Sequence, residues 1–187
     1  NIINGKPIYY IKDVDGVIYN NTNASVFYCI RCNNVTIKNL ILSQNINGLF
    51  LWKTTNSKIE NIISFNNESG IKLEYSSNNI IINNNLNSNK LYGIFMHKYS
   101  NNNIIANNII SFNKGYGIYF YIRNSNNNIY NNNFINNSSD YVNAAYNSIF
   151  NLPLPIGGNY WSNYDTPIEG CNDIDFNNIC DSPYDLW

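Results

Sequence analysis

Three side chains in this sequence, Lys72, Glu74 and His97, combine groups that proton-transfer chemistry needs, and they occupy related positions. Lys72 and Glu74 follow Gly70 by two and four residues, and His97 follows Gly93 by four. A carboxylate and an imidazole can exchange a proton, while an ammonium group stabilises a developing negative charge. Such a set would suit β-elimination, whereas glycoside hydrolysis commonly requires a second carboxylate. We therefore take these three residues as the candidate catalytic residues of a polysaccharide lyase or glycoside hydrolase.

Aromatic residues occupy these two positions in the segments after Gly48 and Gly117, and the first of them in the segment after Gly93. The set comprises Phe50, Trp52, Phe95, Tyr119 and Tyr121. Flat rings pack against the apolar faces of sugars, and an exposed apolar patch usually marks a contact surface. We therefore expect this set to bind a glycan. Two other interpretations stay open: the rings form a ladder that stabilises stacked strands, or a loop, the C-terminal tail or a neighbouring protein covers them.

Acidic residues concentrate near the C-terminus, where five of the 12 Asp and Glu residues fall between positions 165 and 181. Positions 1, 3, 5 and 9 of a calcium-binding loop would be filled by Asp173, Asp175, Asn177 and Asp181. Asn178 stands at position 6, where Gly is usual, and Tyr184 replaces the bidentate Glu at position 12. We expect a structural Ca²⁺ here, with a solvated acidic turn as the alternative. Candidates to complete its ligand shell are Asp165, Glu169 and Asp185.

An internal repeat positions these residues. Gly48, Gly70, Gly93 and Gly117 open similar segments, at steps of 22, 23 and 24 residues. Counting 23 residues outward from Gly48 and Gly117 reaches Ser25 and Asp140, which begin two imperfect copies. Each copy has a second run rich in Ile and Asn about ten residues later. Short alternating runs separated by Asn, Ser and Gly indicate strands, and this period indicates one coil of a β-solenoid.

Alternation predicts which side chains of each first strand point inward. The predicted inward files are Val26, Leu49, Ile71, Ile94 and Ile118, then Tyr28, Leu51, Leu73, Met96 and Phe120. The predicted outward files are Phe27, Phe50, Lys72, Phe95 and Tyr119, then Cys29, Trp52, Glu74, His97 and Tyr121. Stacked coils also predict asparagine ladders, one with Asn39, Asn61, Asn84, Asn107 and Asn131, and one with Asn45, Asn66, Asn89 and Asn113.

The composition excludes several classes of protein. The 187 residues include 44 Asn and 30 Ile but only 4 Ala and 4 Glu, which argues against a helical bundle. A net charge of −1 without a basic run gives no case for nucleic acid, and no apolar stretch is long enough to span a membrane. We expect one all-β domain: an N-terminal strand region 1–24, coils over 25–150, and a C-terminal cap over 151–187.

The four cysteines form two pairs. Cys171 and Cys180 bracket the acidic loop, and we expect a disulfide between them, which would hold its carboxylates together. Cys29 and Cys32 lie about five coils, or roughly 24 Å, from that pair, so the two pairs cannot join. Whether Cys29 and Cys32 are bridged to each other stays open.

The repeats resemble those of the NosD-type parallel β-helix proteins, within the group of carbohydrate-binding and sugar-hydrolysing β-helix domains. The segments that carry the resemblance are GLFLW, GIKLE, GIFMH and GIYFY, and the flanks NIINGKPIYYI and GGNYWSNYD are similar to those of archaeal cell-surface proteins. The resemblance covers almost the whole chain. It implies a right-handed parallel β-helix of about six coils with a C-terminal cap. The copper role of NosD is not expected here, because His97 and Met96 are the only residues of their types and Met96 is predicted to point inward.

We interpret the chain as a non-catalytic extracellular or cell-surface module that presents its aromatic strand face to a glycan or to a neighbouring surface protein. The expected partners are thus a polysaccharide, a glycoprotein glycan or adjacent cell-surface proteins. Two hypotheses remain beside this one. The first is a polysaccharide lyase or glycoside hydrolase acting in the same groove, and the second is a purely structural subunit of a cell envelope.

Overall fold

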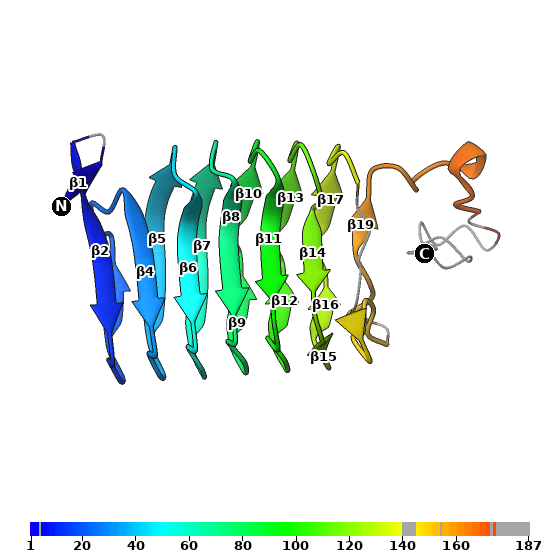
Figure 1. The fold of residues 1–187 in the computed structure, drawn as a ribbon. Helices are drawn as coiled ribbons and strands as arrows, with labels where there is room; N and C mark the ends of the chain where they lie inside the picture. The colour runs from blue at the N-terminus through cyan, green and yellow to red at the C-terminus, as the bar shows by residue number, and fades with distance from the viewer. Residues whose placement is uncertain (4, 140–144, 154, 173, 175–187) are drawn as a thin grey trace.

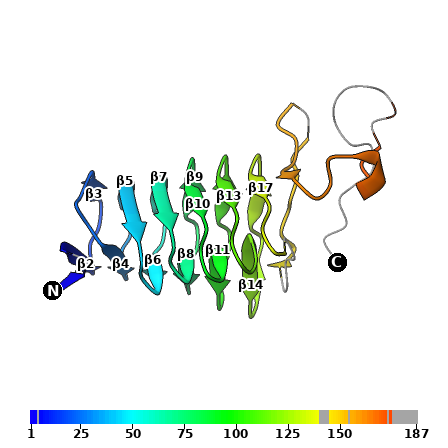
Figure 2. The same ribbon diagram turned by 90° about the horizontal axis from the view of Figure 1, so that it is seen from above.

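The computed structural model describes residues 1–3, 5–139, 145–153, 155–172 and 174. It confirms the predicted all-β fold, a parallel β-helix of about six coils that stack along one axis (Figure 1). Within the described residues, helical structure is limited to the 3₁₀ turn η1 (Pro167–Glu169), and no helix there is long and apolar enough to cross a membrane. Figure 2 shows the two larger sheets as separate walls of the stack. The buried apolar side chains of both sheets belong to one core cluster.

The first strands of the coils form one sheet. Seven strands of the described chain join it, in the order β1-β2-β4-β6-β8-β11-β14. Neighbours pair in parallel, except that β1 pairs with β2 antiparallel at the N-terminal edge. The bounds are β1 (Ile2–Ile3), β2 (Lys6–Lys12), β4 (Val26–Ile30), β6 (Asn47–Trp52), β8 (Ser69–Glu74), β11 (Tyr92–His97) and β14 (Ile118–Tyr121).

The second runs of the coils form a ten-stranded sheet, again counted over the described residues. Its strands β5 and β7 are long, whereas the later coils contribute two short strands each, although an Asn with positive φ stands at the corresponding corner in all of them. The bounds are β3 (Ile18–Asn20), β5 (Thr36–Ser43), β7 (Lys58–Phe65), β9 (Ile80–Ile82), β10 (Asn85–Asn87), β12 (Ile104–Ala106), β13 (Ile109–Ser111), β16 (Asn128–Tyr130), β17 (Asn133–Ile135) and β19 (Tyr160–Trp161). A separate pair joins β15 (Asn124–Ser125) to β18 (Ala145–Tyr146).

Buried asparagines form ladders along the inside of the stack. The backbone N–H of Asn84 donates to Oδ1 of Asn108 at 2.9 Å, and that of Asn108 donates to Oδ1 of Asn132 at 3.0 Å. Nδ2 of Asn108 donates to the carbonyl of Ile81 and to Oδ1 of Asn132. These amides are at most 2% exposed, so hydrogen bonds between coils replace those that water would make.

The predicted membership of the ladders was wrong by one residue in two places. Asn83, with φ 58°, shares the outer corner with Asn39, Asn61, Asn107 and Asn131, while Asn84 lies inside. Asn67, not Asn66, continues the inner ladder to Asn89 and Asn113. In both places two asparagines are adjacent, so residue type alone does not separate the outer position from the inner one.

The repeated glycines are required by close packing between coils. A Cβ at Gly48, Gly70 or Gly93 would lie 2.8, 2.7 or 2.7 Å from the carbonyl oxygen of the glycine one coil further on. A side chain of any size would therefore push the coils apart. This explains why the repeat is marked by Gly at the start of each first strand.

In the coil that begins with β4, the inward and outward side chains are the reverse of those predicted. Phe27 pairs with Leu49 and Cys29 with Leu51, and both Phe27 and Cys29 are fully buried. Tyr28 instead lies in the outward file with Phe50. The step from this coil to the next is 22 residues rather than 23, and a one-residue slip moves every side chain of a strand to the other face.

Cys29 and Cys32 are bridged by a disulfide inside this first coil, with their Cα atoms 5.9 Å apart. Cys171 is also disulfide-bonded, but Cys180, its predicted partner, lies outside the described residues. The predicted calcium ligands Asp173, Asp175, Asn177 and Asp181 also lie outside them.

The residues after the last coil close its end. The Trp161 ring stacks on Phe134, with centroids 4.1 Å apart and planes 8° apart, and Trp161 is 6% exposed. Asn159 extends the inner ladder by accepting a hydrogen bond from the backbone N–H of Asn132. Asp165 and Glu169 already have partners: Asp165 accepts from the Tyr160 hydroxyl, and Glu169 accepts from the backbone of residues 165 and 166.

Candidate functional site

The strand register aligns the predicted site residues on the outward face of the seven-stranded sheet. Two parallel files of side chains run along the axis, and we call them together the aromatic face. The first file is Tyr10, Tyr28, Phe50, Lys72, Phe95 and Tyr119. The second file is Lys12, Ile30, Trp52, Glu74, His97 and Tyr121.

The rings of the first file are linked into one surface by Lys72. Its Nζ lies 5.1 Å from the ring centroid of Phe50 on one side and 5.4 Å from that of Phe95 on the other. Beyond Phe95, the Tyr119 ring follows at a centroid distance of 5.7 Å. An ammonium group over ring faces is favourable. Lys72 therefore fills the position where the file has no ring and keeps the surface continuous.

The second file contains fewer aromatic rings than the first, but its side chains also pack against one another. Nζ of Lys53 lies 4.6 Å above the Trp52 ring, and the His97 and Tyr121 rings stack at 5.3 Å with their planes 13° apart. Tyr121 is 43% exposed, whereas Trp52 and His97 are half-buried. The His97 and Tyr121 rings thus cover one another's faces, and Tyr121 keeps a larger exposed fraction than Trp52 or His97.

Glu74 joins the two files through an ion-pair cluster. Its Oε2 lies 3.1 Å from Nδ1 of His97 and 3.3 Å from Nζ of Lys72, and its Oε1 lies 3.9 Å from Nζ of Lys98. Although Nδ1 of His97 is close to Glu74, the two groups are not aligned as a hydrogen bond requires. The buried Nδ1 therefore has no hydrogen-bond partner among the described residues. The structure therefore brings the three candidate catalytic residues together, with the Glu74 side chain only 16% exposed.

The charge state of Glu74 follows from its neighbours. Burial by itself raises the pKa of Glu74, but His97 and Lys72 together outweigh burial, so that its pKa lies below its ordinary value. Glu74 is thus an ionised carboxylate at neutral pH. A general acid or base works best when its pKa is near the operating pH, so this shift favours charge pairing over proton transfer.

The second carboxylate that hydrolysis commonly uses is not found beside Glu74 in the described chain. Glu60 lies on β7, in the other sheet, where it pairs with Lys58 and Lys38. Glu68 lies at a corner of the coil, and Asp140 is outside the described residues. The described geometry thus gives a mixed-charge aromatic surface with one carboxylate.

Sequence reasoning missed two rings of this face. Tyr92 stacks on Tyr119 at 5.0 Å, and Tyr116 lies 4.9 Å from Tyr119. Both precede a repeat glycine directly, in the pairs Tyr92-Gly93 and Tyr116-Gly117, and this repetition was the available signal. With them, the C-terminal half of the face becomes its most aromatic part.

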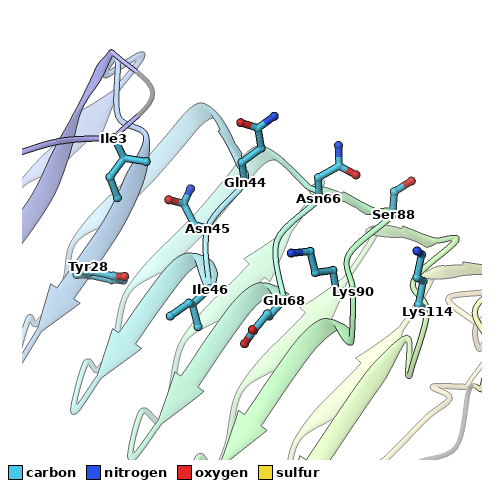
Figure 3. A pocket seen from close by; sticks show the side chains of 10 residues that line it. All are labelled: Ile3, Tyr28, Gln44, Asn45, Ile46, Asn66, Glu68, Ser88, Lys90 and Lys114. Atoms are coloured by element: carbon cyan, nitrogen blue, oxygen red, sulfur yellow. The ribbon is translucent and has the colours of Figure 1, made fainter.

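A groove borders the aromatic face at the corner where the ten-stranded sheet turns into the seven-stranded one. It has a volume of about 720 Å³ and crosses several coils (Figure 3). We call it the corner groove. Its lining residues are Ile3, Tyr28, Gln44, Asn45, Ile46, Asn66, Glu68, Ser88, Lys90 and Lys114. Tyr28 belongs to both the groove and the aromatic face, so the two surfaces are continuous.

Comparison with known proteins identifies similar sequences and folds. The family model described as "Periplasmic copper-binding protein (NosD)" matches residues 8–166. Among solved structures, the periplasmic alginate epimerase AlgG matches 71% of this chain, with 18% sequence identity and a TM-score of 0.31. This chain spans 37% of the epimerase chain. No curated protein matches the sequence.

Proposed function

Because this chain belongs to the NosD family, described as periplasmic copper-binding protein, we propose that it is a β-helix module of the periplasm or cell surface. Its role in this proposal is non-catalytic, and its aromatic face binds a glycan. A neighbouring surface protein is the other partner that such a face would suit.

The observation that carries the proposal is the mixture of rings and cations in two continuous files. Half-buried aromatic residues on an outward strand face offer apolar surface on which sugar rings can pack, although a ladder of rings also stabilises stacked strands. Lys72, Lys53 and Lys98 stand among the rings and offer donors to sugar hydroxyls. Stacking and hydrogen bonding are thus available side by side along the axis.

A glycan array tests this proposal. Trp52→Ala and Tyr121→Ala should each weaken binding by about fivefold, since an aromatic stacking contact contributes on the order of 1 kcal/mol. Phe65→Ala is the matched control, because Phe65 is a half-buried outward ring on β7 of the other sheet. Binding that is absent on every glycan would refute the proposal and favour a structural envelope subunit.

A catalytic role is the second candidate, and the contact between Glu74, His97 and Lys72 is the observation in its favour. Incubation with polyuronates and neutral polysaccharides would reveal it through chain shortening. Glu74→Gln is the control variant, and cleavage that this variant abolishes would replace the non-catalytic proposal with a lyase or hydrolase.

The residues of this chain do not fit copper, although the family description names that metal. Copper sites use imidazole, thiolate and thioether ligands. His97 is the single histidine, Met96 is fully buried, and Cys29 and Cys32 share a disulfide. Among the residues that the structure describes, no three His, Cys, Asp or Glu side chains gather as a metal site. We therefore assign no step to copper, and we propose Ca²⁺ at Asp173, Asp175, Asn177 and Asp181 as the structural metal.

A further inference from the structure

A lysine and a tyrosine recur together at the corner groove. The segments Lys90-Leu91-Tyr92 and Lys114-Gly115-Tyr116 lie 24 residues apart, the length of one coil. Each lysine directly follows a rung of the inner ladder, in which Asn89 donates to Oδ1 of Asn113. Lys90 and Lys114 therefore occupy equivalent positions in neighbouring coils, about 4.8 Å apart along the axis at the level of the backbone.

The two tyrosines connect this pair of lysines to the aromatic face. The Tyr92 and Tyr116 rings stack with centroids 6.1 Å apart and planes 24° apart, and both pack against Tyr119 of the first file. Figure 3 shows Lys90 and Lys114 on adjacent coils along one side of the groove. A ligand on the aromatic face could thus reach both ammonium groups without leaving the surface.

These two lysines differ from Lys72 and Lys98 in their contacts with carboxylates. Lys72 and Lys98 share the carboxylate of Glu74. In the described part of the chain, no ion pair joins Lys90 or Lys114 to a carboxylate, and both side chains are exposed. Glu68 lines the same groove, also without an ion pair to a described residue.

We propose that the glycan of the aromatic face is anionic, and that its carboxylate or sulfate groups bind Lys90 and Lys114 while its sugar rings pack on Tyr92 and Tyr116. This inference rests on the proposed function and adds the chemical class of the ligand. Lys90 and Lys114 form no ion pair with a described residue and are therefore available to an anion, whereas Lys72 and Lys98 already contact Glu74. Glu68 repels the same anion and limits its affinity.

Two matched pairs of polymers test the charge of the ligand. Titration calorimetry compares dextran sulfate with dextran, and polygalacturonate with its fully methyl-esterified form. We expect at least one charged member to bind about tenfold more tightly than its neutral partner, with a preference that falls as salt is raised. The pair in which this happens identifies sulfate or carboxylate as the group bound.

Variants of the groove residues show which side chains cause the preference for the charged polymer. The double variant Lys90→Gln/Lys114→Gln should lose roughly tenfold in affinity for the charged polymer and little for the neutral one, while Glu68→Gln should bind the charged polymer more tightly. The control Lys38→Gln/Lys58→Gln makes the same change in net charge on the other sheet and should leave affinity unchanged.

Three outcomes would overturn the inference while leaving glycan binding in place. These are equal affinity for charged and neutral polymers, undiminished affinity of the Lys90→Gln/Lys114→Gln variant, and an equal loss in the control variant. Absence of binding to all four polymers, together with a silent glycan array, would instead refute the proposed function itself.

Discussion

Glu74 shows how a single carboxylate organises the aromatic face. Its two oxygens contact the ammonium groups of Lys72 on the same strand and Lys98 on the next coil, and its pKa is below the ordinary value because His97 and Lys72 outweigh the effect of burial. The side chain thereby holds Lys72 between the rings of Phe50 and Phe95. The structure supports a positioning role for Glu74 on the aromatic face.

The lowered pKa predicts how Glu74 contributes to stability as pH changes. A carboxylate with a depressed folded-state pKa stabilises the fold above its ordinary pKa of 4.5, and that contribution disappears as pH falls through the folded-state pKa. Glu74→Gln should therefore lower the free energy of unfolding by about 1 kcal/mol near pH 7 and by much less in acid.

Urea denaturation of both proteins from pH 7 down to pH 3 measures this difference. Glu68→Gln is the control, because Glu68 is exposed and joins no described ion pair, and it should be nearly neutral throughout. A difference between wild type and Glu74→Gln that stays constant across the range would contradict the assigned charge pairing.

At the scale of strands and coils, sequence spacing predicted most of the register and therefore which side chains share the aromatic face. The step between glycines aligned Phe50, Lys72, Phe95 and Tyr119 correctly, because the close approach of backbones forces Gly to one position in each coil. The first coil lacks that Gly, and its VFYCI segment has apolar or aromatic residues at every position. The alternation of residue types therefore could not show which side chains of this segment point inward.

Adjacent asparagines limited the prediction in the same way. Where two asparagines follow one another, one turns the chain outward with positive φ and the other enters the ladder, and the two roles use the same side chain. The contacts of Glu74 with His97 and Lys72 depend on side-chain rotamers as well as on strand register. Residue spacing therefore indicated that the three side chains lie close together, but not which of their atoms are in contact.

Asn107 and Asn108 offer a direct test of these two roles. Asn108→Ala removes hydrogen bonds to Ile81 and Asn132 in a buried setting and should cost about 2–4 kcal/mol. Asn107→Gly changes only an exposed corner with φ 55° and should be nearly neutral, since Gly adopts that conformation readily. Chemical denaturation measures both, and similar losses for the two variants would contradict the ladder.

At the scale of the whole molecule, the stack of coils provides a rigid surface on which one ligand can contact several repeats. The aromatic face supplies rings, and the corner groove, continuous with it through Tyr28, supplies Lys90 and Lys114, which form no ion pair with a described residue. The net charge of the chain is only −1. Any preference for an anionic glycan would therefore come from the local arrangement of charges rather than from the overall balance.

The proposed calcium site lies in the predicted C-terminal cap, so Ca²⁺ bound there would contribute to the stability of the whole chain. If Asp173, Asp175, Asn177 and Asp181 bind Ca²⁺, chelation removes a ligand that stabilises the folded state, so EDTA should lower Tm by several degrees. Added Ca²⁺ should restore it, whereas Mg²⁺ at the same concentration should not. Thermal melts monitored by circular dichroism measure the change, and an unchanged Tm would remove calcium from the account.

The most direct test of the central claim is to locate a bound glycan on the surface by NMR. Titration of isotope-labelled protein with a binding oligosaccharide should shift the backbone amide signals of β6, β8, β11 and β14, and the Trp52 indole signal among the side chains. Signals from the outward face of β5 and β7, around Ile41 and Ile63, should stay in place. Shifts confined to that second face, or to the end of the stack, would contradict the account.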